Sequence, residues 1–489
     1  MAFITGSGVG SIRRPRPDVR AMEEHNGMSP DQQPEPSIWD ASNLALTLGS
    51  ILAVTLGAFQ GLAVATIAPV LADDLNGRGL YGWIFTSFLL PQIIGTVLAG
   101  REVDRRSPAV VFYTAMALFA LGCFLAGAAP NIWVLFAGRA LQGLGAGGTF
   151  ATVYAIISGA YEDRLRPSML AAISSAWVIP SLIGPVIAGF IADHYSWRYV
   201  FWGLLPILAI IAPLTLPSYR KISLERDPDA VVNPRRVPYA LVLAVGTGLF
   251  LAGPDLRPLP LGAMVTLAGL VLLIPVLQRL LPAGTFSARP MIGSALATRS
   301  LCFGAFAVTE TYMVFSLTEF GGVSTATAGI VLTFGSLTWT SGSILQARLD
   351  RQHGPGSRTA RARAGVTIML AGVGIIFGTI VIFDDIWVII AALGWMMTGL
   401  GIGLAYSTST TVAFANTPRG QDGMVSSSTL LCDLFTSSVG VGLGGVLLAF
   451  TLGLDWSAPP SAALSMSLGV VMLAMAWLAA WRMSTSRTA

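Results

Sequence analysis

Three charged residues stand inside long apolar runs, where a charge needs a reason to be present: Arg139, Glu310 and Asp433. A charge at the centre of a membrane-spanning helix costs about 2.5–3.5 kcal/mol on insertion scales, so it normally faces a cavity or a partner. Burial favours the neutral form of a carboxyl group, whereas a nearby guanidinium favours the charged form. We therefore interpret Glu310 as a proton-accepting group, with a static polar contact between helices as the alternative.

The depths of these residues favour a common polar layer. At about 1.5 Å per residue, Gln60, Arg139 and Glu310 fall at similar distances from one end of their apolar runs. Arg139 could instead extend toward the membrane surface. Asp433 lies nearer the other end of its run, where it is either a second polar site or a structural hydrogen-bonding group.

Aromatic residues accompany Glu310 along the same run, at positions 303, 306, 312 and 315. They could receive apolar or cationic substrates, because aromatic faces attract cations, or they could face lipid and neighbouring helices. They are Phe303, Phe306, Tyr312 and Phe315.

The composition requires a membrane setting for these residues. The 489-residue chain is 54% hydrophobic and only 11% charged, against about 25% charged in average proteins. Its basic residues are dispersed, which gives no reason to expect nucleic-acid binding. The three cysteines lie in separate apolar runs without metal-ligand spacing, so we expect neither a metal nor a cofactor.

A spanning helix needs about 20 apolar residues, and the chain offers fourteen such segments. An all-α membrane protein is therefore expected, since unpaired strands are too costly in lipid. The predicted spans are 43–72, 80–100, 109–129, 132–160, 168–192, 198–217, 238–253, 259–281, 295–320, 326–347, 364–383, 386–412, 423–452 and 461–482.

The basic residues between the spans predict the orientation. Counting from a cytoplasmic N-terminus, only Arg78, Arg198 and Arg257 fall outside, and all other loop arginines fall inside, as the positive-inside rule requires. Both termini are then cytoplasmic, and the chain is expected in the inner (plasma) membrane. The predicted layout is a disordered tail (1–40), a six-helix bundle (41–217), a cytoplasmic linker (218–237), two extra spans (238–281), a second six-helix bundle (295–482) and a short tail (483–489).

Three segments combine glycine, proline and charge in ways that suggest moving helices. The turn after the second span carries Gly100, Asp104 and Arg105, and an Asp–Arg turn, Asp350 and Arg351, recurs after the tenth. A basic inside turn is the simpler interpretation of both. The other two segments are Arg139, Gln142 and Gly143 in span 4, and Gly184, Pro185 and Gly189 in span 5. Small residues of this kind also serve ordinary close packing.

These segments resemble motifs of the major facilitator superfamily, and their order resembles its fourteen-span drug/proton antiporter branch. The resemblance implies two six-helix bundles that rock about a central site, with the Gly100 turn as an inner latch and the Gly184–Gly189 segment as typical of exporters. Relatives often carry an acid in helix 1 where this chain has Gln60, which shifts the expected proton site to Glu310.

We therefore expect a monomeric secondary transporter that exports drug-like or amphipathic compounds in exchange for protons. A carrier of one metabolite or lipid, with or without protons, is the alternative. An enzyme is disfavoured because no nucleophile–base pair or metal cluster falls at one depth, and a primary pump because no phosphate-binding GxxxxGK[ST] segment is present.

Overall fold

The computed structural model is helical throughout the residues it describes, namely 37–40, 43–103, 105–162, 165–222, 236–256, 258–281, 284–285, 287–382, 388–417, 422–454, 456 and 458–483. The first helices are α2 (Leu44–Asp74), α3 (Tyr81–Val103), α4 (Pro108–Gly127), α5 (Ile132–Ala160), α6 (Arg166–Ser175), α7 (Val178–His194), α8 (Arg198–Trp202) and α9 (Leu204–Lys221). The remainder are α10 (Arg236–Ala252), α11 (Leu259–Leu280), α12 (Ile292–Glu319), α13 (Thr325–His353), α14 (Arg358–Ile382), α15 (Val388–Ala415), α16 (Asp422–Leu452) and α17 (Ala458–Trp481). Short 3-10 turns, η2 (Arg78–Leu80), η3 (Gly253–Asp255) and η4 (Pro355–Ser357), precede α3, follow α10 and precede α14.

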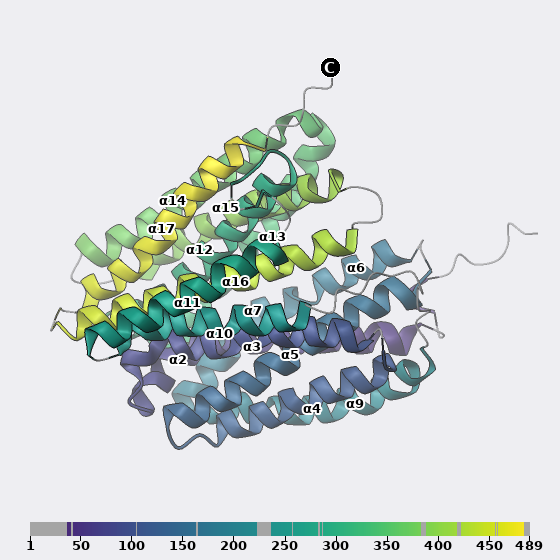
Figure 1. Cartoon of the computed structure of the whole chain (residues 1–489), viewed down its shortest axis with the longest axis horizontal. Helices are drawn as coiled ribbons and strands as arrows, with labels where there is room; N and C mark the ends of the chain where they lie inside the picture. Colours follow the sequence, from purple (N-terminus) through teal and green to yellow (C-terminus); the bar gives the residue numbers. More distant parts are fainter. Residues whose placement is uncertain are drawn as a thin grey trace, which may run out of the picture.

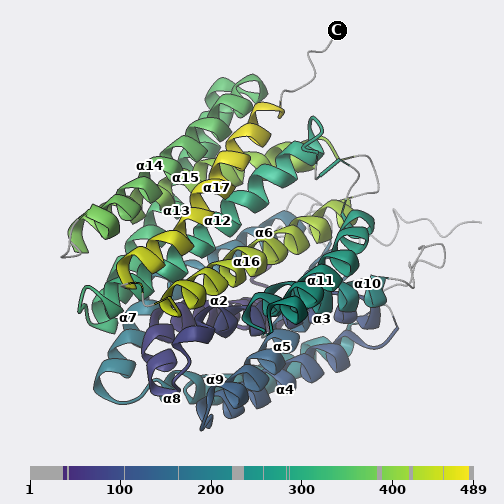
Figure 2. The same ribbon diagram turned by 60° about the vertical axis from the view of Figure 1, so that its left-hand side comes forward.

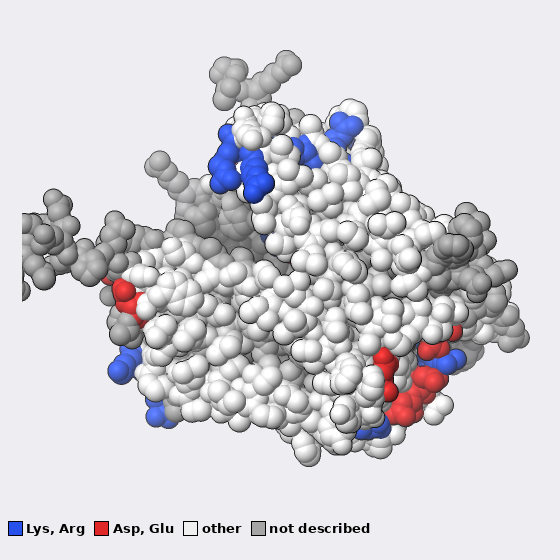
Figure 3. Space-filling model, turned by 180° about the vertical axis from the view of Figure 1, so that it is seen from behind, with Lys and Arg blue, Asp and Glu red and all other residues white. Residues whose placement is uncertain are grey.

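Twelve helical segments are long and apolar enough to cross a membrane, and α7 and α10 are shorter apolar helices. This makes the chain a multi-pass membrane protein. One face of the surface agrees, because charged residues gather near its margins and leave a broad uncharged belt between them (Figure 3).

Two of the predicted spans contain a break in their helix, although span 6 still lies within a single segment, Arg198–Lys221, that is long and apolar enough to cross a membrane. Span 5 becomes α6 and α7, and span 6 becomes α8 and α9. Pro180 is the third residue of α7 and Pro206 the third of α9. A proline lacks an N–H and its ring clashes with the carbonyl four residues earlier, so the preceding helix stops before it. The prolines were visible in the sequence as signals for these breaks.

The helices form two bundles joined along their sides (Figures 1 and 2). In the first bundle α5 packs against α3 and α4, and α2 packs against α7 and α9. In the second, α15 packs against α13 and α14, and α12 packs against α15, α16 and α17. The bundles meet along two seams, α3 with α16 and α7 with α13, with α2 and α12 in contact between them.

The helices α10 and α11 form a pair beside the α3–α16 seam. They pack on each other, and α10 contacts both α3 and α16. One apolar cluster joins all four helices through Ile93, Leu243, Leu273 and Leu434. The pair is therefore attached to both bundles.

Candidate functional site between the bundles

The two bundles contact each other closely at one end of the molecule, which we call the closed end. There the hydroxyl of Tyr81 on α3 donates to the carbonyl oxygen of Thr311 on α12 at 3.2 Å, and the Tyr81 ring packs at a tilt against the Phe315 ring, with their centroids 4.7 Å apart. Gly82 and Gly445 bring the backbones of α3 and α16 together, and a Cβ on Gly82 would lie 2.9 Å from the Gly445 Cα. From this end the two sets of helices diverge toward the other, the splayed end (Figure 1).

Charged groups add two contacts between the bundles at the closed end. Arg78 bridges to Glu319 of α12 at 2.8 Å. The carboxylate of Asp193, at the end of α7, accepts hydrogen bonds from the backbone N–H groups of Thr325 and Ala326 at 3.2 and 2.9 Å. An anion is stabilised at this position because the first N–H groups of α13 lack helical partners.

Glu310 lies on α12 one residue before the Thr311 contact. Its side chain is intermediate in exposure, and no hydrogen bond or ion pair to it occurs among the described residues. A carboxylate in this condition inside a membrane-spanning helix is unusual, because such charges are normally paired. Among the described residues, Glu310 is therefore an unpaired carboxyl group beside a contact that holds the bundles together.

Arg139 lies in a separate polar network inside the first bundle. Its guanidinium donates to the Ile84 carbonyl oxygen at 3.1 Å and to Gln142 Oε1 at 3.0 Å, and it sits 4.4 Å over the Phe88 ring. Gln60 also reaches Gln142 Oε1, at 3.5 Å. Arg139 is 2% exposed, so it does not extend to the surface. The network unites Gln60, Gln142 and Arg139 but contains no carboxylate among the described residues.

A second charged group lies nearer the splayed end. Arg299 of α12 pairs with Asp433 of α16 at 2.8 Å, and the Tyr406 hydroxyl of α15 donates to the same carboxylate oxygen at 2.9 Å. Arg299 also contacts the Tyr406 hydroxyl and lies 4.1 Å over its ring. We call these three residues the ionic triad.

Sequence reasoning predicted Asp433 but missed its partners. Arg299 was counted among the inner-side charges although it falls inside span 295–320, and Tyr406 carried no distinguishing pattern. The position of Arg299, four residues before Phe303 and eleven before Glu310, was the available signal, because these intervals place all three on one helix face.

The aromatic residues predicted near Glu310 divide into two groups. Phe303 and Phe306 pack against Trp339 of α13, and Phe303, Trp339 and Tyr406 are partly exposed. Tyr312 and Phe315 are buried against Tyr81 at the closed end. The first group combines the partly exposed Phe303 with the buried Phe306, and the second lies in the contact between the bundles at the closed end.

The glycine and proline motifs lie where helices touch. Gly143 contacts the Phe88 carbonyl of α3. The Pro185 carbonyl lies against Gly329 and Gly189 against Ala326, so the span 5 segment faces α13 of the other bundle. Gly184 faces Phe59.

The two Asp–Arg turns differ in what the structure describes. Asp350 pairs with Arg358 and Arg361 within the second bundle, while Arg351 is exposed, as is Gly100 in the first turn. Asp104 lies outside the described residues, and Arg105 stands beside it.

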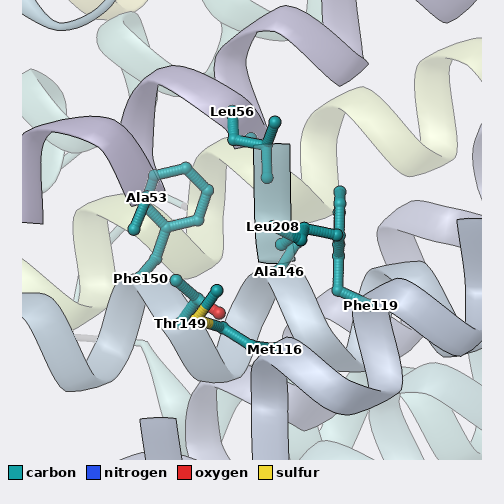
Figure 4. A pocket seen from close by; sticks show the side chains of 9 residues that line it. Ala53, Leu56, Met116, Phe119, Ala146, Thr149, Phe150 and Leu208 are labelled. Atoms are coloured by element: carbon teal, nitrogen blue, oxygen red, sulfur yellow. The ribbon is translucent and has the colours of Figure 1, made fainter. Parts of the chain in front are cut away.

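A small apolar cavity lies apart from these sites, inside the first bundle (Figure 4). Its volume is about 20 Å³. Thr149 supplies its one hydroxyl, and the other lining residues are Ala53, Leu56, Gly57, Met116, Phe119, Ala146, Phe150 and Leu208. It offers no charged group to a ligand.

Two helical bundles with charged groups between them define a membrane transporter rather than an enzyme. The family model described as the Major Facilitator Superfamily matches residues 49–441, and the chain belongs to this superfamily.

Several similar proteins are named as efflux pumps or efflux transporters. An MFS-type efflux pump of Arthroderma benhamiae is 31% identical over 193 residues, which cover 40% of this chain and 36% of that pump. The chain thus matches about a third of the length of that fungal relative. A probable multidrug-efflux transporter of Mycobacterium tuberculosis is 26% identical over 409 residues, 81% of this chain and 85% of that protein.

Solved structures share the fold. The POT family transporter PepTSo superposes with a TM-score of 0.66 at 11% identity, covering 89% of this chain and 97% of that one. A D-xylose-proton symporter gives a TM-score of 0.62 at 14% identity, covering 88% and 97%.

Proposed function

We propose that this protein is a monomeric secondary transporter that exports drug-like or amphipathic compounds in exchange for protons. The observation that carries the proposal is Glu310, an unpaired and partly exposed carboxylate inside a membrane-spanning helix. The names of the relatives as efflux pumps support the direction.

The proposed topology has fourteen spans with both termini cytoplasmic in the inner (plasma) membrane. The twelve long segments are joined by α10 and by the divided span α6–α7. The closed end, which carries Arg78 and Arg198, is then the outer end, and the splayed end faces the cytoplasm.

Alternating access follows from this arrangement. Inward opening exposes the inter-bundle space to the cytoplasm, where a substrate enters past Phe303 and Trp339. Closing the splayed end requires the contacts of the closed end to part, among them the Tyr81–Thr311 hydrogen bond. A proton on Glu310 biases this equilibrium only by binding the two states with different affinity.

The substrate class that fits is an organic cation with an apolar body. Glu310 supplies an uncompensated negative charge, and aromatic faces contribute attraction to a cation. Substrate and proton then compete for one carboxylate, which is the requirement for exchange.

Reconstituted liposomes test the proposal. With an imposed pH gradient, the wild type should move ethidium against its concentration gradient. Glu310→Gln should weaken ethidium binding and abolish gradient-driven movement while the unfolding temperature is retained. Leu393→Val, at an exposed position of α15 that belongs to neither site, serves as control. Full gradient-driven transport by Glu310→Gln would refute the proton role.

A carrier of a specific metabolite or lipid, without proton coupling, is the second candidate. Gln60 favours it, because an uncharged amide stands where an acid is common in drug/proton antiporters. In the same liposomes such a carrier would exchange labelled solute with no dependence on pH gradient.

A further inference from the structure

We infer that Asp433 is a second proton-carrying group, and that its proton determines whether the Arg299 charge opposes an organic cation between the bundles. The inference rests on the proposed function and extends it from one exchanged proton to two.

The hydrogen bonds of Asp433 leave one of its oxygens available. Arg299 and Tyr406 both donate to Oδ2, while Oδ1 is buried and has no hydrogen-bond partner among the residues that the structure describes. A proton can be added at Oδ1 while Oδ2 still accepts both bonds. An unpartnered buried carboxylate oxygen is costly to maintain, so its presence favours a role over packing alone.

The surroundings of Asp433 contain one permanent charge. Arg299 is its only ion-pair partner among the described residues. The other titratable neighbours are Tyr406 of α15, Cys302 of α12 and the adjacent Cys432, and Tyr154 of α5 faces Arg299 from the first bundle. The charge of the triad is therefore zero with Asp433 ionised and positive with Asp433 protonated.

The triad lies on the same face of α12 as Glu310. Arg299 and Glu310 are eleven residues apart, close to three full turns, so their Cα atoms are about 16 Å apart along one stripe. Phe303 lies between them on that stripe. The Arg299 side chain is 12% exposed, so its charge is not fully shielded from the inter-bundle space.

Protonation of Asp433 then acts on a cation held at Glu310. The Arg299 charge, no longer neutralised by Asp433, then repels the cation. At a distance of about 16 Å and an effective dielectric constant of about 20, this repulsion weakens cation binding about fivefold. One proton displaces the cation at Glu310, and a second at Asp433 disfavours its return. Both protons are taken from the outer water and released to the cytoplasm, so two enter for each monovalent cation exported.

The coupling ratio tests the inference. In proteoliposomes the opposing pH gradient and membrane potential that give zero net flux of tetraphenylphosphonium report protons moved per cation. We expect two for the wild type and one for Asp433→Asn, with about fivefold weaker tetraphenylphosphonium binding in the variant because Arg299 stays uncompensated.

A double variant guards against misfolding caused by an unpaired arginine. Arg299→Gln combined with Asp433→Asn removes both charges and should bind tetraphenylphosphonium as the wild type does, while still exchanging one proton. A ratio of two in either Asp433 variant overturns this inference alone, whereas a wild type that moves no protons overturns the proposed function with it.

Discussion

A buried arginine without a carboxylate is the clearest case of a residue whose geometry matters more than its charge. Arg139 serves a carbonyl of α3, the amide of Gln142 and the face of Phe88 together. A planar guanidinium can meet all three, whereas an ammonium group is a point charge on a flexible stem.

Arg139→Lys should therefore lower gradient-driven ethidium transport about tenfold although the charge is kept, since a lost hydrogen bond to a charged group costs about 1.5–3 kcal/mol. Initial rates in inside-out vesicles measure the effect. Arg106→Lys, at an exposed arginine paired with Glu102, should leave the rate unchanged. Equal rates for the wild type and Arg139→Lys would mean that charge alone matters.

For single residues, the sequence identified the charged side chains inside the spans but not the residues with which they interact. The apolar settings of Arg139, Glu310 and Asp433 were sufficient to single them out, because charges in lipid are rare. Their depths were not sufficient to group them: Gln60 and Arg139 share a network, whereas Glu310 stands apart and Asp433 pairs with Arg299. The rotation of each helix about its own axis decides which residues pair. A helix that is apolar on all faces gives no sequence signal for this rotation.

Two helices of the first bundle interlock through glycines. Gly95 of α3 lies against the Leu144 carbonyl, and Gly143 and Gly147 of α5 lie against the Phe88 and Gln92 carbonyls. Because glycine has no side chain, these positions on the two helices let the backbones approach closely, as small residues do in membrane helices.

Gly143→Ala should therefore destabilise the protein by about 1–3 kcal/mol, the usual range for overpacking, and lower the unfolding temperature in detergent. Gly374→Ala is the matched control, because nothing lies within 4 Å of its Cβ position and alanine favours a helix by up to about 1 kcal/mol. If both variants melt alike, the α3–α5 approach is looser than described.

Hydropathy predicted where the helices lie along the chain, but it did not predict the breaks within them. The apolar runs gave span limits within a few residues, as for 80–100 and α3 (Tyr81–Val103). The breaks before Pro180 and Pro206 depend on local backbone geometry, while Pro69 and Pro91 are accommodated within continuous helices. Neighbouring helices decide between these outcomes, so proline alone is an ambiguous signal.

In the proposed alternating-access cycle, the contacts of the closed end set the balance between the two states of the whole molecule. Asp193 joins the end of one bundle to the start of α13 in the other, whereas Asp74 pairs with Arg198 within a single bundle. Of these two contacts, only the one made by Asp193 must break when the closed end opens.

Asp193→Ala should shift the population toward the state opened at this end by about tenfold or more, since hydrogen bonds to a charged group contribute about 1.5–3 kcal/mol. Spin labels that replace the exposed Trp133 and Trp456 would report this shift as a larger fraction of molecules with a long distance between the labels. Asp74→Ala should leave the distance distribution as in the wild type, and an equal shift in both variants would exclude a specific latch.

The attachment of α10 and α11 makes the two flanks of the molecule unlike. On one flank this pair bridges the α3–α16 seam through a continuous apolar cluster, while on the other α7 and α13 meet directly and present Ile183 and Ile187 outward. A solute dissolved in the bilayer meets an additional wall of helices on the first flank and only the bundles themselves on the second. Access from the lipid therefore differs between the two flanks of the molecule within the plane of the membrane. This difference is separate from the one between the outer and cytoplasmic ends.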